Sequence, residues 1–200
     1  MDHNPDWQHQ YYTPTAIPDS GFVLPWCDSP MDRENVGEQV YLQLLGEARD
    51  YVYINTPYLV IDDSMVSALC LAAKRGVDVR LTLPHRGDNR AVHMTTRSYY
   101  PELITAGVKV YEYTPGFVHA KSFVCDDRVA TVGTTNLDFR SLYLNFECGA
   151  YLCGCEAVLS VKQDYLDTLE KCRLITPDDC RFGPLRKLCQ NVMRLLAPLI

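Results

Sequence analysis

The residues of this sequence best suited to chemistry lie in FVHAKSFVCDD, residues 117–127. His119 and Lys121 stand two positions apart in an apolar, strand-like run, so both side chains are expected on the same face of a sheet. A charged lysine on a buried face is strongly destabilising unless an anion meets it. The spacing therefore raises the question of which anion this lysine binds.

The chain after this stretch brings more polar groups towards the pair. Asp126 and Asp127 end the strand in a tight turn, and the sequence RVATVGTTN then returns. If the return is antiparallel, its far end, Gly133 to Asn136, lies alongside the histidine and the lysine. Gly133 lets the backbone approach a ligand closely, while Thr134 and Asn136 add neutral hydrogen-bond donors. An imidazole, an ammonium, a hydroxyl and a carboxamide at one point suit a phosphate group.

Each of these residues alone has a simpler interpretation. A single histidine on a strand is usually a hydrogen-bonded core residue, and a single lysine usually faces solvent. The combination is rarer, because His-x-Lys-x4-Asp arises by chance in roughly one chain in eighty of this composition. The phosphate-site interpretation is therefore favoured over a set of unrelated residues.

The composition is that of one globular domain, with 200 residues of which 47% are apolar and 22% charged. A net charge of −6 argues against binding nucleic acid mainly through its phosphates, so no nucleic-acid partner is expected. The nine cysteines are scattered without C-x-x-C pairs, which predicts reduced thiols and no metal site. No apolar run approaches the roughly 18 residues needed to span a bilayer, so a soluble segment without transmembrane helices is expected.

Hydrophobic periodicity and turn residues predict one α/β domain. Residues 1–20, rich in Pro, His, Asp and Tyr, are expected to form a linker or irregular arm, and residues 21–200 the domain. Parallel crossover units in the first half and antiparallel neighbours in the second half predict a mixed β-sheet covered by helices on both faces. Helices are expected at 32–50, 62–76, 90–106, 155–172 and 184–197. Strands are expected at 21–26, 51–60 with a stop near Pro57, 77–83, 108–113, 117–125, 128–133 and 147–153.

The last expected helix has two interpretations. Its leucines alternate with Arg186, Lys187 and Arg194, a pattern that suits a helix lying at a membrane interface. More often such a stripe docks on the domain core, and that is the favoured expectation.

The same residues carry a resemblance to a known family. The segment from His119 to Asn136 matches the H-x-K-x4-D-x6-G-[ST]-x-N signature of the phospholipase D superfamily. NLDFRSLYLNFE at 136–147, INTPYL at 54–59 and AGVKVYEY at 106–113 resemble more closely the C-terminal half of bacterial cardiolipin synthases. The resemblance covers about residues 21–200. The matching signature positions are His119, Lys121, Asp126, Gly133, Thr134 and Asn136.

This resemblance implies the phospholipase D-like fold and a phosphatidyl transfer through a phosphohistidine, in which two phosphatidylglycerols give cardiolipin and glycerol. One histidine would attack phosphorus, a second would protonate the leaving alkoxide, and Lys121 would neutralise the non-bridging oxygens. Glu147 would accept from the other ring nitrogen of a histidine, and Asp126 is expected to hold the turn. No cofactor or metal is implied. The implied catalytic residues are His119, Lys121, Asp126 and Glu147, and the implied phosphate-binding residues are His119, Lys121, Thr134 and Asn136.

The chain departs from the two-motif members of the superfamily because it contains the signature once. The other histidines, at positions 3, 9, 85 and 93, lack a lysine two residues later. The second motif is therefore expected from a missing N-terminal half, the favoured alternative, or from a second copy of the chain. The partners implied for the assembled enzyme are phosphatidylglycerol and a membrane surface, and its implied location is the bacterial inner membrane.

Other functions stay open at this point. One is a single-motif phosphodiesterase or nuclease working as a homodimer, although the negative net charge weighs against a nuclease. Another is a structural half-domain, inert alone, that contributes one histidine and a lipid-facing surface to a partner chain. The sequence also leaves open whether His119 is the nucleophile or the general acid.

Overall fold

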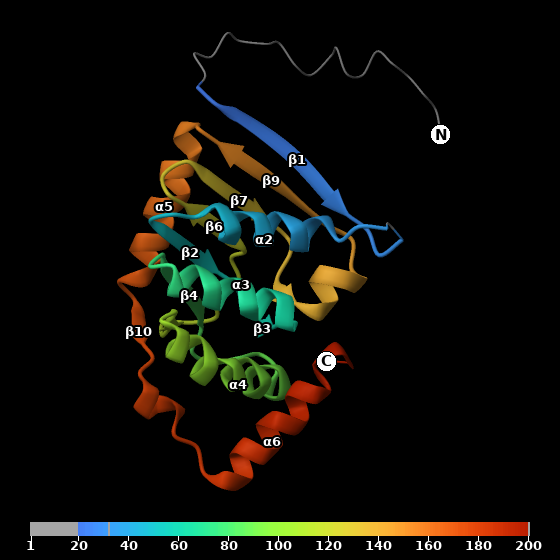
Figure 1. Ribbon diagram of the computed structural model, residues 1–200, viewed down its shortest axis with the longest axis vertical. Coiled ribbons are helices and arrows are strands. Elements are labelled where there is room, and N and C mark those ends of the chain that lie inside the picture. Colours follow the sequence, from blue (N-terminus) through green and yellow to red (C-terminus); the bar gives the residue numbers. More distant parts are fainter. Residues whose placement is uncertain (1–19, 32, 200) are drawn as a thin grey trace.

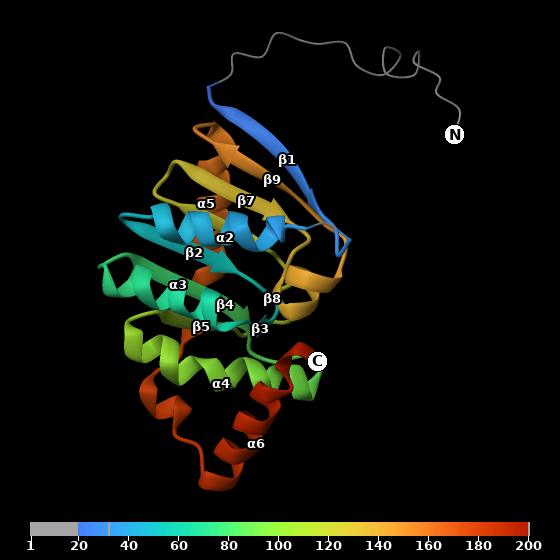
Figure 2. The same cartoon turned by 45° about the vertical axis from the view of Figure 1, so that its right-hand side comes forward.

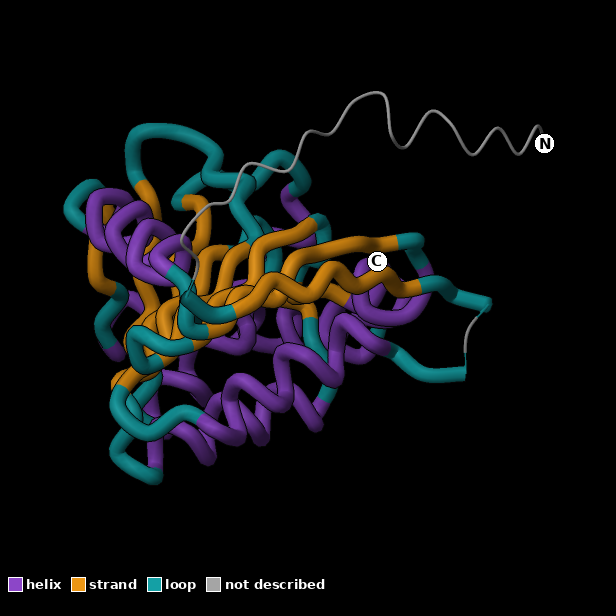
Figure 3. The backbone as a smooth tube through the Cα atoms, turned by 90° about the horizontal axis from the view of Figure 1, so that it is seen from above, coloured by secondary structure: helices purple, strands orange, loops and turns teal. Residues whose placement is uncertain are grey.

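The computed structural model describes residues 20–31 and 33–199 of the chain (Figure 1). Except for Ser20, the arm expected at residues 1–20 lies outside the described residues. The described part forms an eight-stranded mixed sheet, and Figure 3 shows helices on both sides of it. The expected α/β fold is therefore confirmed.

The large sheet has the strand order β1-β9-β7-β6-β2-β4-β5-β10. Strands β2, β4 and β5 run parallel to one another, and the other pairings in this sheet are antiparallel. A separate parallel pair joins β3 to β8. The strands are β1 Phe22–Asp28, β2 Tyr51–Asn55, β3 Leu59–Val60, β4 Asp78–Pro84, β5 Lys109–Tyr113, β6 Ser122–Cys125, β7 Val129–Gly133, β8 Leu137–Asp138, β9 Glu147–Cys153 and β10 Cys172–Leu174.

Helices α2, α3 and α4 lie side by side on one face of the sheet, and α5 covers the other face (Figures 1 and 2). The central strand β2 is buried on both sides because alternate residues point to opposite faces. Val52 and Ile54 enter the core under the three helices, while Tyr51 and Tyr53 enter the core under α5. The helices are α2 Val36–Glu47, α3 Asp63–Lys74, α4 Arg90–Ala106, α5 Glu156–Leu169 and α6 Pro184–Leu195, with short turns η1 Arg140–Leu144, η2 Pro177–Cys180 and η3 Ala197–Leu199.

Local chemistry fixes several helix ends where the sequence places them. The Asp62 carboxylate accepts from the Met65 N–H at 2.9 Å and caps the start of α3. The side-chain oxygen Oδ1 of Asn89 accepts from the Ala91 N–H at 2.9 Å and caps α4. Gly107, with φ of +103°, ends α4 in the left-handed conformation that glycine adopts without strain.

The strand expected at 117–125 begins only at Ser122, which corrects the sequence prediction. Its neighbour β2 ends at Asn55, opposite Ser122. The chain after β2 contains Pro57, which has no N–H to donate to a neighbouring strand. Residues 117–121 therefore lack a strand partner on that side. They lie in an irregular segment that is more open to solvent than a strand interior.

Other differences also arise from pairing between distant residues. The strand expected at 51–60 ends at Asn55, close to the stop expected near Pro57, whereas Leu59–Val60 forms a separate short strand that pairs with Leu137–Asp138. The helix expected at 155–172 ends at Leu169, since Cys172–Leu174 forms β10 against β5. Hydrophobic periodicity indicates which residues of one segment are buried, and it carries no information about which distant strand that segment pairs with.

The last helix, α6, presents its apolar side to solvent, contrary to the favoured expectation that it docks on the core. Leu185 and Leu195 are 75% and 82% exposed. The opposite side of the helix packs on α4, where Arg194 pairs with Glu102 at 2.8 Å and lies over the Tyr99 ring. Among the described residues, no helix combines the length and apolar character required to cross a bilayer.

Candidate functional site

The β6–β7 hairpin brings the two halves of the motif together. The Gly133 N–H donates to the Lys121 carbonyl at 3.2 Å, so residues 133–136 return beside residues 119–121 as the sequence indicates. His119, Lys121, Thr134 and Asn136 line one open hollow together with Gly133. The space beside Gly133 is tight, because a Cβ there would lie 2.5 Å from the Cys148 carbonyl oxygen.

Within this hollow the lysine and the histidine contact each other directly. Lys121 Nζ lies 2.9 Å from His119 Nδ1 and donates to the His119 carbonyl at 2.8 Å. Lys121 Nζ also lies 3.1 Å from His119 Nε2, and because an ammonium can only donate, only an unprotonated ring nitrogen can accept from it. The imidazole also stacks on Phe117 and meets the edge of Tyr58.

The electrostatics of the hollow favour a neutral imidazole and an available cation. Partial burial and the charge of Lys121 hold the pKa of His119 below its usual value. Burial lowers the pKa of Lys121 as well, and the negative charges of Glu147 and Asp138 offset part of this effect. The described hydrogen bonds of the Lys121 ammonium all go to His119, so its charge is not neutralised by a direct carboxylate contact within the described residues.

Glu147 is near the hollow but does not make the contact expected of it. Its side chain is buried at the start of β9, and its carboxylate accepts from Asn145 Nδ2 at 3.3 Å. No hydrogen bond between Glu147 and His119 is present in the described part of the chain. The expectation that Glu147 fixes a histidine tautomer therefore stays a prediction.

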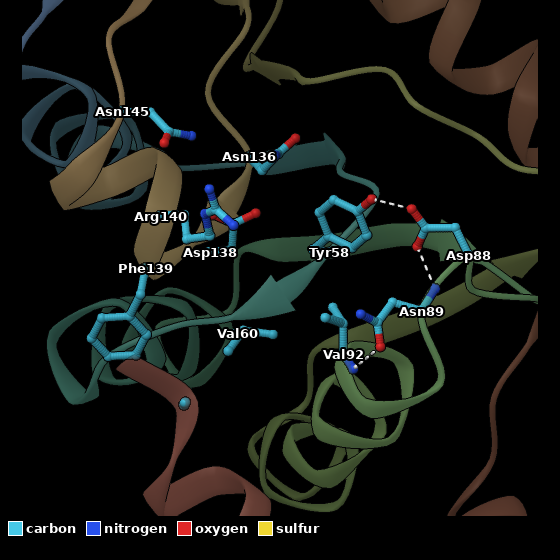
Figure 4. Close-up of a pocket in the computed structure, with 11 residues that line it drawn as sticks. Tyr58, Val60, Asp88, Asn89, Val92, Asn136, Asp138, Phe139, Arg140 and Asn145 are labelled. Atoms are coloured by element: carbon cyan, nitrogen blue, oxygen red, sulfur yellow. Dashed lines mark hydrogen bonds between the residues drawn. The ribbon is translucent and has the colours of Figure 1, made fainter. Parts of the chain in front are cut away.

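A cavity of about 290 Å³ adjoins the hollow and shares Asn136 with it (Figure 4). Tyr58 donates to Asp88 at 2.6 Å on one side of the cavity, while Asp138 and Arg140 lie on the other. Burial and the hydrogen bond to Asp88 raise the pKa of Tyr58 to about 12. The buried Asn136 Oδ1 has no hydrogen-bond partner among the described residues, so it is available to a ligand donor.

Sequence reasoning missed Tyr58 and Asp88, although a signal for them existed. They follow β2 and β4, two parallel neighbours, so both lie beyond the same carboxyl edge of the sheet. Ligands of open α/β sheets bind at this edge. His119 precedes β6, which is antiparallel to β2, and therefore reaches the same edge from the other direction.

Comparison with known proteins decides the family. The model of the family described as "Cardiolipin synthase, PLD-like domain" matches residues 41–167. This chain belongs to that family.

Relatives of this PLD-like domain include proteins named as cardiolipin synthases. The chain is 36% identical over 212 residues to the cardiolipin synthase of Halalkalibacterium halodurans, covering 98% of this chain and 41% of the relative. It is 42% identical over 164 residues to cardiolipin synthase 2 of Bacillus cereus, covering 82% and 32%. An uncharacterised protein of Streptococcus mutans is 47% identical over 182 residues, covering 90% and 40%. The chain thus spans about two fifths or less of the length of these relatives.

Solved structures support the same fold for this PLD-like domain. The phospholipase D family member Nuc of Salmonella typhimurium superposes with a TM-score of 0.65 at 17% identity, over 77% of this chain and 99% of that one. The phosphatidylserine synthase of Haemophilus influenzae gives a TM-score of 0.72 at 15% identity, over 89% of this chain and 48% of that one. At these identities the likeness establishes the fold alone.

In this PLD-like domain the signature aspartate, Asp126, lies at the far end of the hairpin from the hollow. Asp126 and Asp127 have φ of +53° and +56°, and the Arg128 N–H donates to the Cys125 carbonyl at 3.0 Å. The connection between β6 and β7 is the three residues Asp126 to Arg128, and aspartate tolerates the positive φ at its first two positions. The Asp126 carboxylate accepts from three backbone N–H groups before and within β2, at Arg49, Asp50 and Tyr51, over 2.8–3.0 Å.

Asp126 therefore holds the turn, as the sequence analysis expects, and its place among the implied catalytic residues stays a prediction. Partial burial would raise its pKa, but the three N–H donors outweigh this effect and lower the pKa below its usual value. The described residues also contain no group of three or more His, Cys, Asp or Glu side chains placed to hold a metal ion.

Asp126→Asn is expected to lower the free energy of unfolding by about 1.5–3 kcal/mol, because a charge-assisted acceptor of three N–H groups is replaced by a neutral one. Asparagine tolerates the positive φ, so backbone strain does not contribute. Since the folded-state pKa is lowered, this stability is present above the unfolded pKa near 3.9 and disappears as the pH falls through the folded value. Urea unfolding of both proteins at several pH values measures the difference.

Asp127→Asn is the matched control, because it makes the same change at the adjacent turn position. Asp127 accepts from the Lys162 and Tyr51 side chains at the surface, so Asp127→Asn is expected to lower the free energy of unfolding by less than about 1 kcal/mol. The structural role of Asp126 would be contradicted if both variants lost the same free energy of unfolding. It would also be contradicted if the stability difference between Asp126→Asn and the wild-type protein did not become smaller at acidic pH.

Proposed function

We propose that this chain is a phosphatidyltransferase module of the cardiolipin synthase type, joining two phosphatidylglycerols into cardiolipin and releasing glycerol. The observation that carries the proposal is the hollow in which the His119 imidazole meets the ammonium of Lys121, which contacts no carboxylate of the described residues directly. Asn136 completes the hollow with a carboxamide. The cardiolipin synthase names of the relatives supply the substrate class.

His119 acts as the nucleophile in this proposal. Its lowered pKa supports that role, because attack on phosphorus needs an unprotonated ring nitrogen. The ring nitrogen bonds to the phosphorus of the first phosphatidylglycerol, the phosphorus–oxygen bond to glycerol breaks, and the glycerol alkoxide takes a proton from a second imidazole. The primary hydroxyl of the second phosphatidylglycerol then returns a proton to that imidazole and displaces the histidine from phosphorus. Lys121 and the Thr134 and Asn136 side chains stabilise the charge on the non-bridging oxygens.

The adjoining cavity is proposed to hold the glycerol part of the phosphodiester. It begins at Asn136, next to the proposed phosphate position, and its other walls carry Asp88, Asn89, Asp138 and Arg140. Hydroxyl groups both donate and accept, so they suit a lining that mixes carboxylates, a carboxamide and a guanidinium. Two carboxylates in the lining disfavour a second anionic group there.

The second imidazole is proposed to come from another phospholipase D-like unit, either a second copy of the chain or a further part of the same polypeptide. The site face of this chain suits such a partner. Leu144 and Phe146, which flank the Asn145 at the cavity, are 59% and 69% exposed. Apolar side chains of this size beside a polar site are typical of a surface that another domain covers.

The experiment that tests the function begins with molar mass by light scattering across a range of concentrations. The protein is then added to phosphatidylglycerol vesicles and, separately, to supercoiled plasmid. If the chain dimerises, we expect cardiolipin and glycerol to form while the plasmid stays intact. A monomer must first be joined to a second phospholipase D-like unit. Plasmid nicking without cardiolipin formation by the assembled protein would replace this proposal with the nuclease alternative.

The exposed side of α6 is proposed to bind an anionic lipid surface. Residues 181–200 carry four basic and no acidic side chains, whereas the rest of the chain carries a net charge of −10, given −6 for the whole. The leucine stripe and three of these basic residues, Arg186, Lys187 and Arg194, lie on α6, where Arg194 pairs with Glu102 of α4. Ala197, beyond the end of α6, lines the cavity of the site. Binding through α6 would therefore hold the site close to the lipid headgroups.

The double substitution Leu188→Ser and Leu195→Ser is expected to weaken binding to phosphatidylglycerol vesicles more than tenfold, because each leucine inserted into the lipid contributes about 1.5–3 kcal/mol. Both side chains are exposed, so folding should be unaffected. Leu71→Ser, at a 59% exposed leucine on α3, is the control. Vesicle sedimentation measures the partition, and equal binding by the double variant and the control would exclude α6 as the contact.

A further inference from the structure

Two exposed cysteines face each other across the edge of the large sheet. In the antiparallel pairing of β1 with β9, Cys27 lies directly opposite Cys148. Both residues are exposed. Of the strand pairings in the described part of the chain, this is the only one that opposes two cysteines.

The hydrogen bonds of Cys148 show which kind of antiparallel pair this is. Its carbonyl accepts from the Thr134 N–H at 2.9 Å, and its own N–H donates to Thr134 Oγ1 at 3.0 Å. Both backbone groups of Cys148 therefore point towards the β7 side and away from β1. Since N–H and C=O of one strand residue point the same way, Cys27 and Cys148 form a non-hydrogen-bonded pair.

A non-hydrogen-bonded pair has the geometry that a disulfide needs. Its Cα atoms lie about 4.5 Å apart, and its side chains extend from the same face of the sheet. Disulfides span Cα separations of about 4.4–6.8 Å. Cys27 and Cys148 can therefore be joined by rotating their side chains, without moving the strands.

Four of the other cysteines are less suited to oxidation. Burial raises the pKa of the Cys125 thiol to about 12 and that of Cys172 to about 11. Cys70 and Cys180 are buried as well. Because the thiolate is the species that reacts, these thiols react slowly with oxidants, whereas an exposed pair has both access and a resolving partner.

We propose that Cys27 and Cys148 are an oxidation site of this protein and form a cross-strand disulfide when exposed to a peroxide. One thiolate attacks hydrogen peroxide, giving a sulfenic acid and one water after proton transfer. The second thiol then displaces the hydroxyl as a second water and forms the sulfur–sulfur bond. Two thiols are thus oxidised by one peroxide, and a thiol reductant reverses the change.

The disulfide would act on the wall of the candidate site. It ties the edge strand β1 to the residue that fixes Thr134, one of the side chains lining the hollow. It also closes a long segment of the chain into a loop, which restricts the unfolded state more than the folded one. Oxidation is therefore expected to raise the melting temperature, by about 5–10 °C.

The test treats the reduced protein with one molar equivalent of hydrogen peroxide and identifies linked peptides by mass spectrometry. We expect a monomer that has lost two hydrogens, a peptide pair joining Cys27 to Cys148, and a rise in melting temperature that dithiothreitol reverses. Cys148→Ser and, independently, Cys27→Ser should each abolish the link and the thermal shift. Cys189→Ser, which removes an exposed cysteine on α6, should change neither.

Three results would overturn the proposal. One is the absence of the Cys27–Cys148 peptide in the oxidised wild-type protein. The second is a dominant link between other cysteines or between two chains. The third is an unchanged thermal shift in both serine variants.

Discussion

His119→Ala is expected to lower the rate of phosphatidyl transfer by about ten-thousandfold or more, since loss of a covalent nucleophile or its proton-transfer partner has effects of this size in other group-transfer enzymes. The side chain is exposed, so the free energy of unfolding should change by less than about 0.5 kcal/mol. Cardiolipin formation by the assembled enzyme measures the loss, and a urea titration confirms that the variant folds. Retention of full activity would exclude the mechanism.

A substrate with an activated leaving group separates the two roles open to His119. A p-nitrophenyl phosphodiester needs no acid to protonate its leaving group. If His119 is the nucleophile, His119→Ala stays inactive on this substrate, whereas a general acid role would allow substantial rescue. His93→Ala, at a half-buried histidine on α4 outside the hollow, serves as the control and should retain activity within about threefold.

Lys121→Met is expected to lower transfer by about 100- to 1,000-fold, which corresponds to the 2.7–4 kcal/mol contributed by a donor to a developing oxyanion. The same change removes a cation that lowers the pKa of His119, so that pKa should rise towards its usual value. The rise is partial, because burial is the larger cause and remains. The acidic limb of the pH–rate profile should consequently move to higher pH, because the His119 ring then stays protonated, and unable to attack phosphorus, up to a higher pH.

Two measurements check this prediction independently. The pH dependence of kcat/KM reports activity, and an NMR titration of the His119 ring reports its pKa without any need for turnover. Lys162→Met is the control, since Lys162 pairs with Asp127 at the opposite end of the hairpin. A His119 pKa that stays unchanged in Lys121→Met, or a loss of only a few-fold in rate, would contradict the role given to this lysine.

Much of the site could be predicted from the sequence because its central element is local. The turn at Asp126 and Asp127 begins a three-residue connection, Asp126 to Arg128, and that connection fixes the register in which Gly133 returns to Lys121. A hairpin of this kind involves few residues, so its geometry follows from turn chemistry and the alternation of side chains. The spacing of His119 and Lys121 then indicates a shared ligand.

The parts that could not be predicted depend on distant segments. Tyr58 and Asp88 approach Asn136 only because β2, β4 and β6 are neighbours in the sheet. Asp126 belongs to the turn because three N–H groups more than 70 residues earlier in the chain reach its carboxylate. No periodicity within one segment reports such contacts.

The C-terminal helix gives the clearest contrast between the two levels. Its sequence determined that α6 is strongly amphipathic, with leucines on one side and cations near them. Which side meets the domain depended on the surface of α4, where Glu102 and Tyr99 offer a carboxylate and a ring to Arg194.

The sequence by itself determined most helices and strands and the hairpin, and it indicated which groups could react, because turn chemistry and side-chain alternation act over a few residues. The tertiary structure decided which of the signature residues share a hollow, which one lies in the distant turn, and which apolar face stays open. Those outcomes follow from burial and hydrogen bonding between segments that are far apart in the chain.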